Sequence, residues 1–415
     1  MHKLFSKYLS NATYAALCSD HSYLQKMIIV EVALAQAQAA AGIIPEAAAE
    51  QISTELPMVD FDMDELAADT AKNGIPTIGF LNQAKRAIPE EAANFLHWGV
   101  TSQDITDTAM ILLLKEVSGK VKLELDQIIG AFSKLKTKHG STQLASRTRN
   151  QMAVTMSFAL KVDSWKNPLE RLLTQLDRLE PEVFCLQLAG ADGQLGILGE
   201  KAVQVRDAVG NHLKLTSVPG WHSQREGLTA FADLLARIAA ALGKFGQDVL
   251  TLAQSEVGEV QEIAAGGGSS SMPHKNNPVG SEAMVSLAGV IIDFAAGIKR
   301  AQIHKNERDG IALATEWMLW PKCIEAMGAV LQHGLQVATH LEVHPEKMKS
   351  NIMGQSGMLD SEKATYLLAP YLGLTAAKKK VAAACELAHL ENLHLAQALS
   401  QLTPELNINW KSALQ

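Results

Sequence analysis

One stretch near the middle of the chain combines flexible backbone with polar side chains that can do chemistry. Residues 266–278 read GGGSSSMPHKNNP. The glycines let backbone N–H groups approach a ligand closely, and successive N–H groups can form a nest that binds anions. Lys275 adds a positive charge and Asn277 a neutral donor, so the stretch predicts a loop that holds a carboxylate or phosphate. A flexible surface linker is the alternative that the glycines and serines alone would favour.

Long segments with helical spacing must position this loop. Apolar residues keep a helical period in five segments, at residues 105–139, 154–179, 228–257, 279–302 and 312–341. Runs that alternate with period two are almost absent. We therefore predict an all-α fold with a long central five-helix bundle.

Shorter helical patterns lie on both sides of these segments. Before the bundle they cover residues 22–41, 45–53 and 62–73. We predict three domains, which are an N-terminal helical domain at 1–105, the central bundle with its loop at 106–343, and a small C-terminal helical domain at 344–415.

Composition limits the class of protein. The 415 residues carry a net charge of −7 with no basic tract, which argues against a nucleic-acid partner. The cysteines lack the spacing of a disulfide framework or a zinc site, which favours a reducing compartment; they are Cys18, Cys185, Cys323 and Cys385. The first residues lack the apolar core of a signal peptide, and the apolar stretches are too short or too broken to span a membrane. We expect a cytoplasmic protein without a metal, a cofactor or a membrane partner.

The loop at 269–278 resembles the signature loop of the fumarase/aspartase superfamily, of form GSSxMPxKxNP. Two further segments agree with that superfamily, HWGVTSQD at 97–104 and SRTRNQ at 146–151. The resemblance covers nearly the whole chain, from about residue 4 onward. It implies an all-α enzyme with a small-molecule substrate, and a homotetramer whose central bundles join in one core and whose subunits share active sites.

Two branches of the superfamily are most similar, the adenylosuccinate lyases and the 3-carboxymuconate cycloisomerases. The lyases carry Thr-His where this chain has Thr148-Arg149. An amine or hydroxide leaving group needs a general acid, which histidine supplies near neutral pH. A substrate carboxylate that closes a lactone needs no proton, and an arginine would orient it. The resemblance thus predicts a cycloisomerase of aromatic degradation, with a superfamily lyase or an inactive structural scaffold as alternatives.

The resemblance assigns the proton transfer to Ser269, which would exchange the proton beside a carboxylate. The alternative is that Ser269 only hydrogen-bonds the substrate. His97 is expected to assist the reaction, unless it is a packed structural residue. Lys275 and Asn277 should bind the carboxylate on which charge grows most in the transition state.

Other residues are expected to bind the remaining carboxylates of the substrate. Thr101, Ser102 and Gln103 should donate to one of them at a helix start, or they simply cap that helix. Arg308 should face the substrate, unless residues 305–309 form a solvated run of charges. The other expected ligands are Arg147, Thr148, Arg149 and Gln151; for Gln151 the alternative is an amide on a helix surface.

Overall fold

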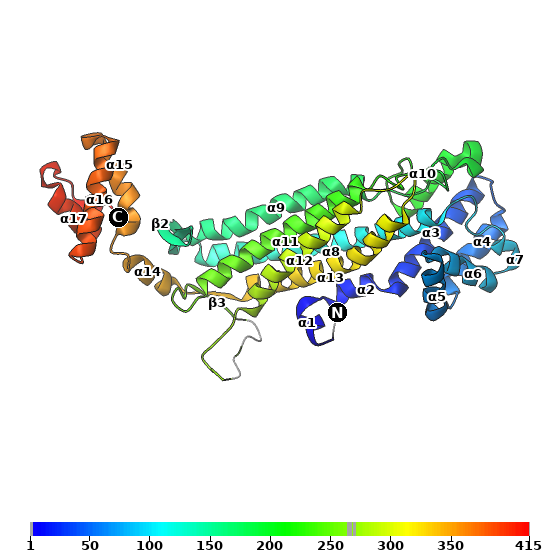
Figure 1. Ribbon diagram of the computed structural model, residues 1–415, viewed down its shortest axis with the longest axis horizontal. Helices are drawn as coiled ribbons and strands as arrows, with labels where there is room; N and C mark the ends of the chain where they lie inside the picture. The colour runs from blue at the N-terminus through cyan, green and yellow to red at the C-terminus, as the bar shows by residue number, and fades with distance from the viewer. Residues whose placement is uncertain (1–2, 264–267, 269–270, 415) are drawn as a thin grey trace. The chain divides into compact units, whose positions relative to one another are not determined.

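The computed structural model describes residues 3–263, 268 and 271–414, and these form an all-α structure with two small sheets (Figure 1). Contacts divide the chain into two compact units. The first unit contains Met1–Gln127, Leu169–Lys244 and Ala283–Leu335. The second unit contains Ile128–Pro168, Phe245–Glu282 and Gln336–Gln415. The all-α fold that the sequence predicts is confirmed.

Short helices fill the N-terminal part of the first unit. Their N-termini are capped by side-chain oxygens where the sequence provides them, as at Asn11, Ser19 and Asp62. The helices are α1 (Lys3–Leu9), α2 (Ala12–Leu17), α3 (Asp20–Ala40), α4 (Glu46–Glu55), α5 (Met63–Asn73), α6 (Thr77–Ala87), α7 (Glu90–Ala93) and, later in the chain, α10 (Ala202–Leu213).

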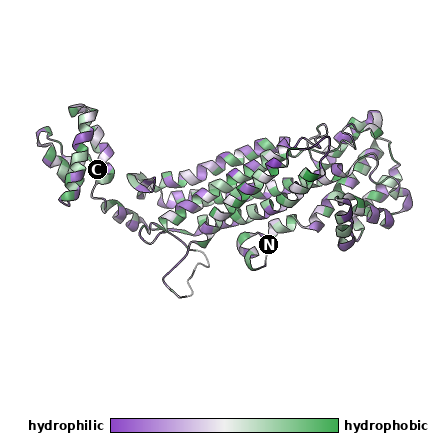
Figure 2. Ribbon diagram, in the orientation of Figure 1, coloured by the Kyte–Doolittle hydropathy of each residue, from purple (hydrophilic) through white to green (hydrophobic). Residues whose placement is uncertain are grey.

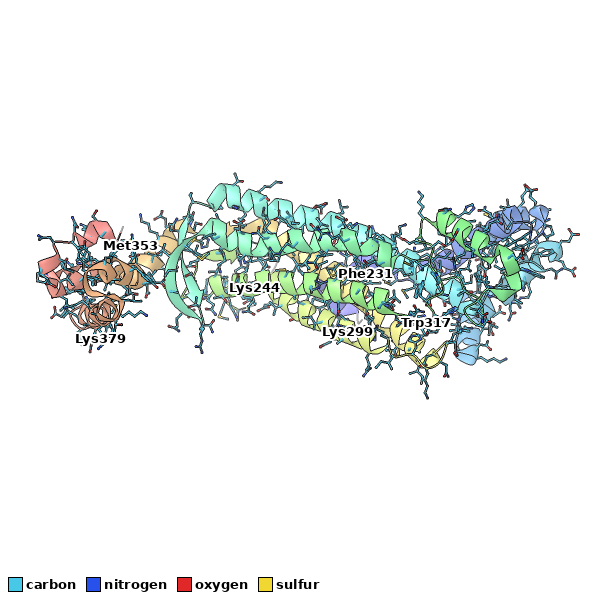
Figure 3. The ribbon with its side chains drawn as sticks, turned by 90° about the horizontal axis from the view of Figure 1, so that it is seen from above. Phe231, Lys244, Lys299, Trp317, Met353 and Lys379 are labelled. Carbon is cyan, nitrogen blue, oxygen red and sulfur yellow. The ribbon has the colours of Figure 1, made fainter. Side chains whose placement is uncertain are left out.

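Five long helices carry most of the apolar pattern, and the parts of them in the first unit lie side by side (Figures 1 and 3). Glycines let their axes approach closely, because a methyl group at Gly297 would lie only 2.6 Å from the Leu319 side chain. Phe231, labelled in Figure 3, is fully buried and packs 6.1 Å from Trp320 between ring centroids. The long helices are α8 (Ser102–His139), α9 (Phe158–Val183), α11 (Glu226–Leu252), α12 (Val279–Arg300) and α13 (Gly310–His340).

Hydrophilic and hydrophobic residues interleave along these helices, as Figure 2 shows. On α8 a spacing of four residues puts Val117, Val121 and Leu125 on one fully buried face. Burying such side chains contributes about 1.5–3 kcal/mol each. The helical period that predicts the bundle is therefore also the pattern that stabilises it.

The second unit contains both sheets. Strands β1 (Gln143–Thr148) and β2 (Gln151–Ser157) form an antiparallel hairpin in which Thr148 pairs with Gln151. Strands β3 (Val260–Glu262) and β4 (Leu341–Val343) form the other pair.

The C-terminal helices of the second unit enclose a small apolar core around Leu368, Leu399 and Trp410. Trp410 also donates to the Thr403 hydroxyl at 2.9 Å, so its buried N–H is satisfied. These helices are α15 (Ser361–Leu372), α16 (Leu374–Leu390), α17 (Leu395–Leu402) and α18 (Trp410–Ala413), and α14 (Pro345–Met353) precedes them in the chain.

Among the described residues α12 is the one helix long and apolar enough to cross a membrane, judged by length and composition alone. A core helix of a soluble protein passes the same test, and side chains such as Met284 and Ile291 of α12 are fully buried. The helix is accounted for as an element of the bundle.

Two details of the predicted helices are wrong. Residues 154–157 belong to strand β2 rather than to a helix, and α9 begins only at Phe158. The helix predicted at 228–257 ends at Leu252, where residues 253–257 form turns. The remaining boundaries lie within a few residues of the prediction, and the division into three domains stays a prediction.

Candidate active site

The HWGVTSQD segment leads into α8, and its threonine contacts a predicted partner. Thr101 is buried, and its hydroxyl oxygen accepts from Nη1 of Arg308 at 2.6 Å. Its backbone N–H donates to the Asp104 carboxylate at 3.0 Å, which satisfies the start of α8. Because arginine can only donate, the Thr101 hydroxyl keeps its own proton for another acceptor. The structure thus joins Thr101 to Arg308, and Arg308 is not part of a freely solvated run of charges.

Gln103 is fully buried, and its amide is bonded on both sides. Its nitrogen donates to Asp107 at 2.9 Å and to the backbone oxygen of His222 at 2.9 Å. Its oxygen accepts from Nε of Arg308 at 3.2 Å. Both amide N–H groups are therefore used inside the chain, whereas Ser102 beside it is partly exposed.

Asp104 is a residue of this segment that sequence reasoning did not nominate. It is fully buried, and five donors surround its carboxylate at 2.9–3.1 Å. The donors are Thr101 N, Gln187 Nε2, Ala189 N, Gly190 N and His222 Nε2. The sequence carries no local signal for its burial, because acidic residues are common in the first turn of a helix. Asp104 anchors the chain around the segment rather than contacting solvent.

A second buried group lies one helical turn further along α8. The Arg225 guanidinium is bonded to Asp107 at 2.7 and 3.1 Å and to Glu316 of α13. Burial raises the pKa of the Glu316 carboxyl, although Arg225 opposes that shift. A buried arginine between two carboxylates is costly to desolvate, and it persists only where its hydrogen bonds are complete.

His97 lies beside a buried carboxylate that the sequence did not point to. Its Nδ1 is 2.6 Å from Oε1 of Glu31, whose side chain is 1% exposed. Burial lowers the pKa of His97, but the charge and hydrogen bond of Glu31 outweigh this, and the net pKa is raised. The backbone of His97 has φ 64°, a strained conformation for a residue other than glycine. Its role as catalytic or structural residue stays a prediction.

The predicted ligands of the second unit begin at the β1–β2 hairpin. Arg149 and Asn150 form its two-residue tip with φ of 50° and 65°, as a type I′ turn requires. Thr148, Arg149 and Gln151 are all exposed. In the part of the chain that the structure describes, the Arg149 guanidinium has no hydrogen-bond or ion-pair partner. Gln151 is a strand residue, so the helix-surface alternative for it is wrong.

Arg147, unlike Arg149, is paired with a carboxylate of the same unit. Its guanidinium makes two bonds of 2.9 Å to the carboxylate of Glu259, which is fully buried. Asn351 of α14 donates to the same carboxylate at 2.8 Å. This geometry joins β1, the segment before β3 and α14, and it satisfies Arg147 inside the second unit.

The signature loop is described only in part, and Ser269 lies outside the described residues. Lys275 is exposed, and its backbone N–H donates to the Met272 oxygen at 3.0 Å. Asn276 donates to the backbone oxygen of Glu262 at 2.9 Å. Asn277 is half-buried and lies just before α12.

Glu262 of β3 anchors the loop to the start of α12. Its buried carboxylate accepts from the backbone N–H groups of Gly280 and Ser281 at 2.8 and 3.0 Å, and from the Ser281 hydroxyl. A carboxylate at a helix N-terminus is stabilised by the helix dipole. This places Asn277 and Lys275 close to a fixed point of the second unit.

The predicted residues thus form two groups. The first unit brings together Thr101, Gln103 and Arg308, with Ser102 beside them and His97 in contact with Glu31. The second unit holds the hairpin residues and the described part of the loop. Hydroxyl, guanidinium and ammonium donors in both groups can bind carboxylates. Among the described residues no group of three His, Cys, Asp or Glu is placed to hold a metal ion.

Comparison with known proteins gives the same family throughout. A family model described as lyase matches residues 8–293. A 3-carboxy-cis,cis-muconate cycloisomerase from Bradyrhizobium diazoefficiens is 34% identical over 97% of this chain and 92% of its own length. A nitrosuccinate lyase from Streptomyces davaonensis is 31% identical over 96% of this chain and 86% of its own length.

Solved structures agree with these sequence relatives. The 3-carboxy-cis,cis-muconate lactonizing enzyme from Pseudomonas putida has a TM-score of 0.91 and 31% sequence identity, and the match covers 100% of this chain and 94% of that one. With the family model matching most of its length, the chain belongs to the lyase family of the fumarase/aspartase superfamily.

Proposed function

We propose that this chain is a cycloisomerase that interconverts 3-carboxy-cis,cis-muconate and 4-carboxymuconolactone in aromatic catabolism. The observation that carries the proposal is Arg149, an exposed guanidinium at a hairpin tip with no partner among the described residues. The adenylosuccinate lyases that the chain resembles carry a histidine at this position. Full-length similarity to proteins named for that reaction supports it.

The reaction needs a carboxylate to add to a carbon–carbon double bond. One carboxylate oxygen forms a C–O bond to the carbon β to a second carboxylate. The electron pair of the double bond moves toward that second carboxylate and gives an enolate-like dianion. The α carbon then takes the proton of the Ser269 hydroxyl, and the serine regains a proton from solvent. The attacking carboxylate needs no general acid, which is why an arginine can replace the histidine.

Each carboxylate of the substrate has candidate donors in this chain. Arg149 orients the carboxylate that closes the lactone. Lys275 and Asn277 bind the carboxylate that becomes the dianion, where stabilisation lowers the barrier most. Arg308 and Thr101, with Ser102 beside them, bind the third carboxylate.

We further propose that the site is completed in a homotetramer. The candidate residues fall into two groups in separate units, and several apolar side chains of the long helices are exposed. Val290 and Ile292 of α12 are 43% and 46% exposed, and Met318 of α13 is 64% exposed. Packing such faces between subunits would remove them from water. Light scattering should then give a mass four times 44.7 kDa, and a monomer would contradict this part of the proposal.

The reaction itself is tested with the purified protein and 3-carboxymuconate. Loss of the conjugated diene absorbance, with lactone as the product, is the expected result. Turnover of adenylosuccinate or another succinyl compound, with no loss of diene, would instead make the chain a superfamily lyase. A protein that is inactive on all of these substrates would support the structural scaffold.

A further inference from the structure

A continuous series of buried polar contacts leads from α13 to Arg308 inside the first unit. Glu316 binds Nε of Arg225 at 3.0 Å, and Arg225 binds Asp107 at 2.7 Å. Asp107 accepts from the Gln103 amide at 2.9 Å, and the Gln103 oxygen accepts from Nε of Arg308 at 3.2 Å. Gln103, Asp107, Arg225 and Glu316 are each 3% exposed or less. Arg308 alone reaches toward the surface.

The chemistry of these partners fixes which way the Gln103 amide faces. The Asp107 carboxylate and the His222 backbone oxygen can only accept, so the amide nitrogen must face them. Arg308 can only donate, so the amide oxygen must face Arg308. A flipped amide would set an oxygen against two acceptors and a nitrogen against a donor.

Charges along the series balance only when Arg308 is included. Asp107 and Glu316 carry two negative charges, and Arg225 supplies one positive charge. Arg308 supplies the second, and the Gln103 amide links it to Asp107. Buried charges are stable where each is paired and fully hydrogen-bonded, so the series favours a guanidinium at the position of Arg308.

Arg308 itself comes from a short loop that has its own anchor. Asp309 accepts from the backbone N–H groups of Lys305 at 2.9 Å and Ile311 at 2.8 Å, which ties the loop to the start of α13. The anchor fixes the backbone, but the direction of the Arg308 side chain depends on Thr101 and Gln103. Two of its five N–H groups are used there, and three have no partner among the described residues.

We propose that Gln103 is a positioning residue that aims the free N–H groups of Arg308 at a substrate carboxylate, with Asp107, Arg225 and Glu316 holding its amide. Gln103 then does not touch the substrate, which differs from the donor role that the sequence predicts for it. The inference rests on the proposed function, in which Arg308 binds one of the three carboxylates.

The test is a double-mutant cycle between Gln103→Leu and Arg308→Ala. With wild-type Arg308, Gln103→Leu should raise KM for 3-carboxymuconate about ten- to hundredfold, the scale of a hydrogen bond to a charged group, and change kcat less. In the Arg308→Ala background the same substitution should add less than about twofold. Equal effects in both backgrounds would overturn the positioning role while leaving the proposed function intact.

Two further measurements keep the inference testable. If Gln103→Leu does not fold, Gln103→Asn keeps the amide chemistry but is one methylene shorter, and it should raise KM in the same Arg308-dependent way. A crystal structure of whichever variant folds should have Arg308 displaced from its present position, and this requires no turnover. An unmoved Arg308 would refute the inference even if the wild-type protein did not act on 3-carboxymuconate.

A matched control separates these effects from general damage to the first unit. Lys299, labelled in Figure 3, pairs with Asp233 at 2.6 Å on the exposed surface. Lys299→Ala should leave both KM and kcat unchanged within about twofold, since exposed ion pairs contribute little. A similar rise in KM in this control would count against a specific role for Gln103.

Discussion

The two groups of candidate residues differ in how many of their side-chain hydrogen-bonding groups are paired within the chain. Thr101 and Gln103 are buried, and they are bonded to two N–H groups of Arg308. Arg149 and Lys275 of the second unit are exposed, with no bond from either side chain among the described residues. The first group is preorganised, so little ordering is needed when a ligand binds. Substrate binding must order the Arg149 and Lys275 side chains, and this ordering cost reduces the affinity.

The largest expected effect comes from the signature loop. Ser269→Ala should lower kcat by about 10³-fold, within the range for proton-transfer catalysis, because no hydroxyl remains to protonate the α carbon. Steady-state kinetics with 3-carboxymuconate measure this, and the mass in light scattering should not change. Ser133→Ala on α8 is a control with near wild-type activity. If Ser269→Ala retains more than a tenth of the activity, Ser269 is a hydrogen-bonding ligand and not the proton donor.

Arg147 and Arg149 of the second unit are two positions apart, but replacing each of them should have a different effect. Arg147→Ala leaves the buried Glu259 carboxylate without its ion pair, which should lower the free energy of unfolding by about 3–5 kcal/mol. Urea denaturation measures the loss. Arg86→Ala, which breaks an exposed pair with Glu65, is a control that should cost at most about 1 kcal/mol. A fully stable Arg147→Ala with a raised KM would instead make Arg147 the substrate ligand that the sequence predicts.

Arg149 should affect activity without supporting the fold. Arg149→His should lower kcat/KM about 100-fold, because histidine lacks the permanent charge and the paired donors of the guanidinium. Arg149→Gly should lose the same activity yet unfold at a higher temperature, since glycine removes a strain of about 1 kcal/mol at φ 50°. Kinetics and thermal melts of the two variants separate these effects. Full activity in Arg149→His would contradict the role that distinguishes the cycloisomerase from the lyases.

The sequence predicts the helices of the bundle more completely than it predicts the contacts of the first group. Helical spacing predicts the five long helices, because burial repeats every three to four residues and each helix is long. The hairpin was missed since Gln151–Ser157 has no clear alternation and the Arg149-Asn150 turn lacks the glycine usual in such turns. Because only two strands pair in this sheet, packing against the rest of the unit, and not the local sequence pattern, determines that Gln151–Ser157 forms a strand.

The buried charges were missed for a different reason. Asp104 and Asp107 lie in the first two turns of α8, where acidic residues commonly face solvent and stabilise the helix dipole. Their burial depends on Arg225 and His222, more than a hundred residues away, which no local pattern reveals. Motif resemblance found Thr101, Gln103 and Arg308, but the direction of each hydrogen bond came only from the structure.

The smallest expected effect tests whether the first group also responds to pH, through Glu31 and His97. The pKa of His97 is raised in the folded protein, so its pairing with Glu31 stabilises the fold fully below the unfolded pKa of about 6.5 and loses that effect as pH rises through the raised value. The charged groups acting on His97 are Glu31, Asp104 and Lys85.

Glu31→Gln removes the charge that holds the His97 proton. The variant should therefore be less stable than wild type by about 1.5 kcal/mol at pH 5, the lower end for a hydrogen bond to a charged group. The difference should shrink as the pH rises to 9, because His97 is then neutral in both proteins. Urea denaturation across this range measures it. If the stability difference instead grew with pH, His97 would be neutral in the folded state. Its contact with Glu31 would then be structural, and His97 would not add a second preorganised cation to the first group.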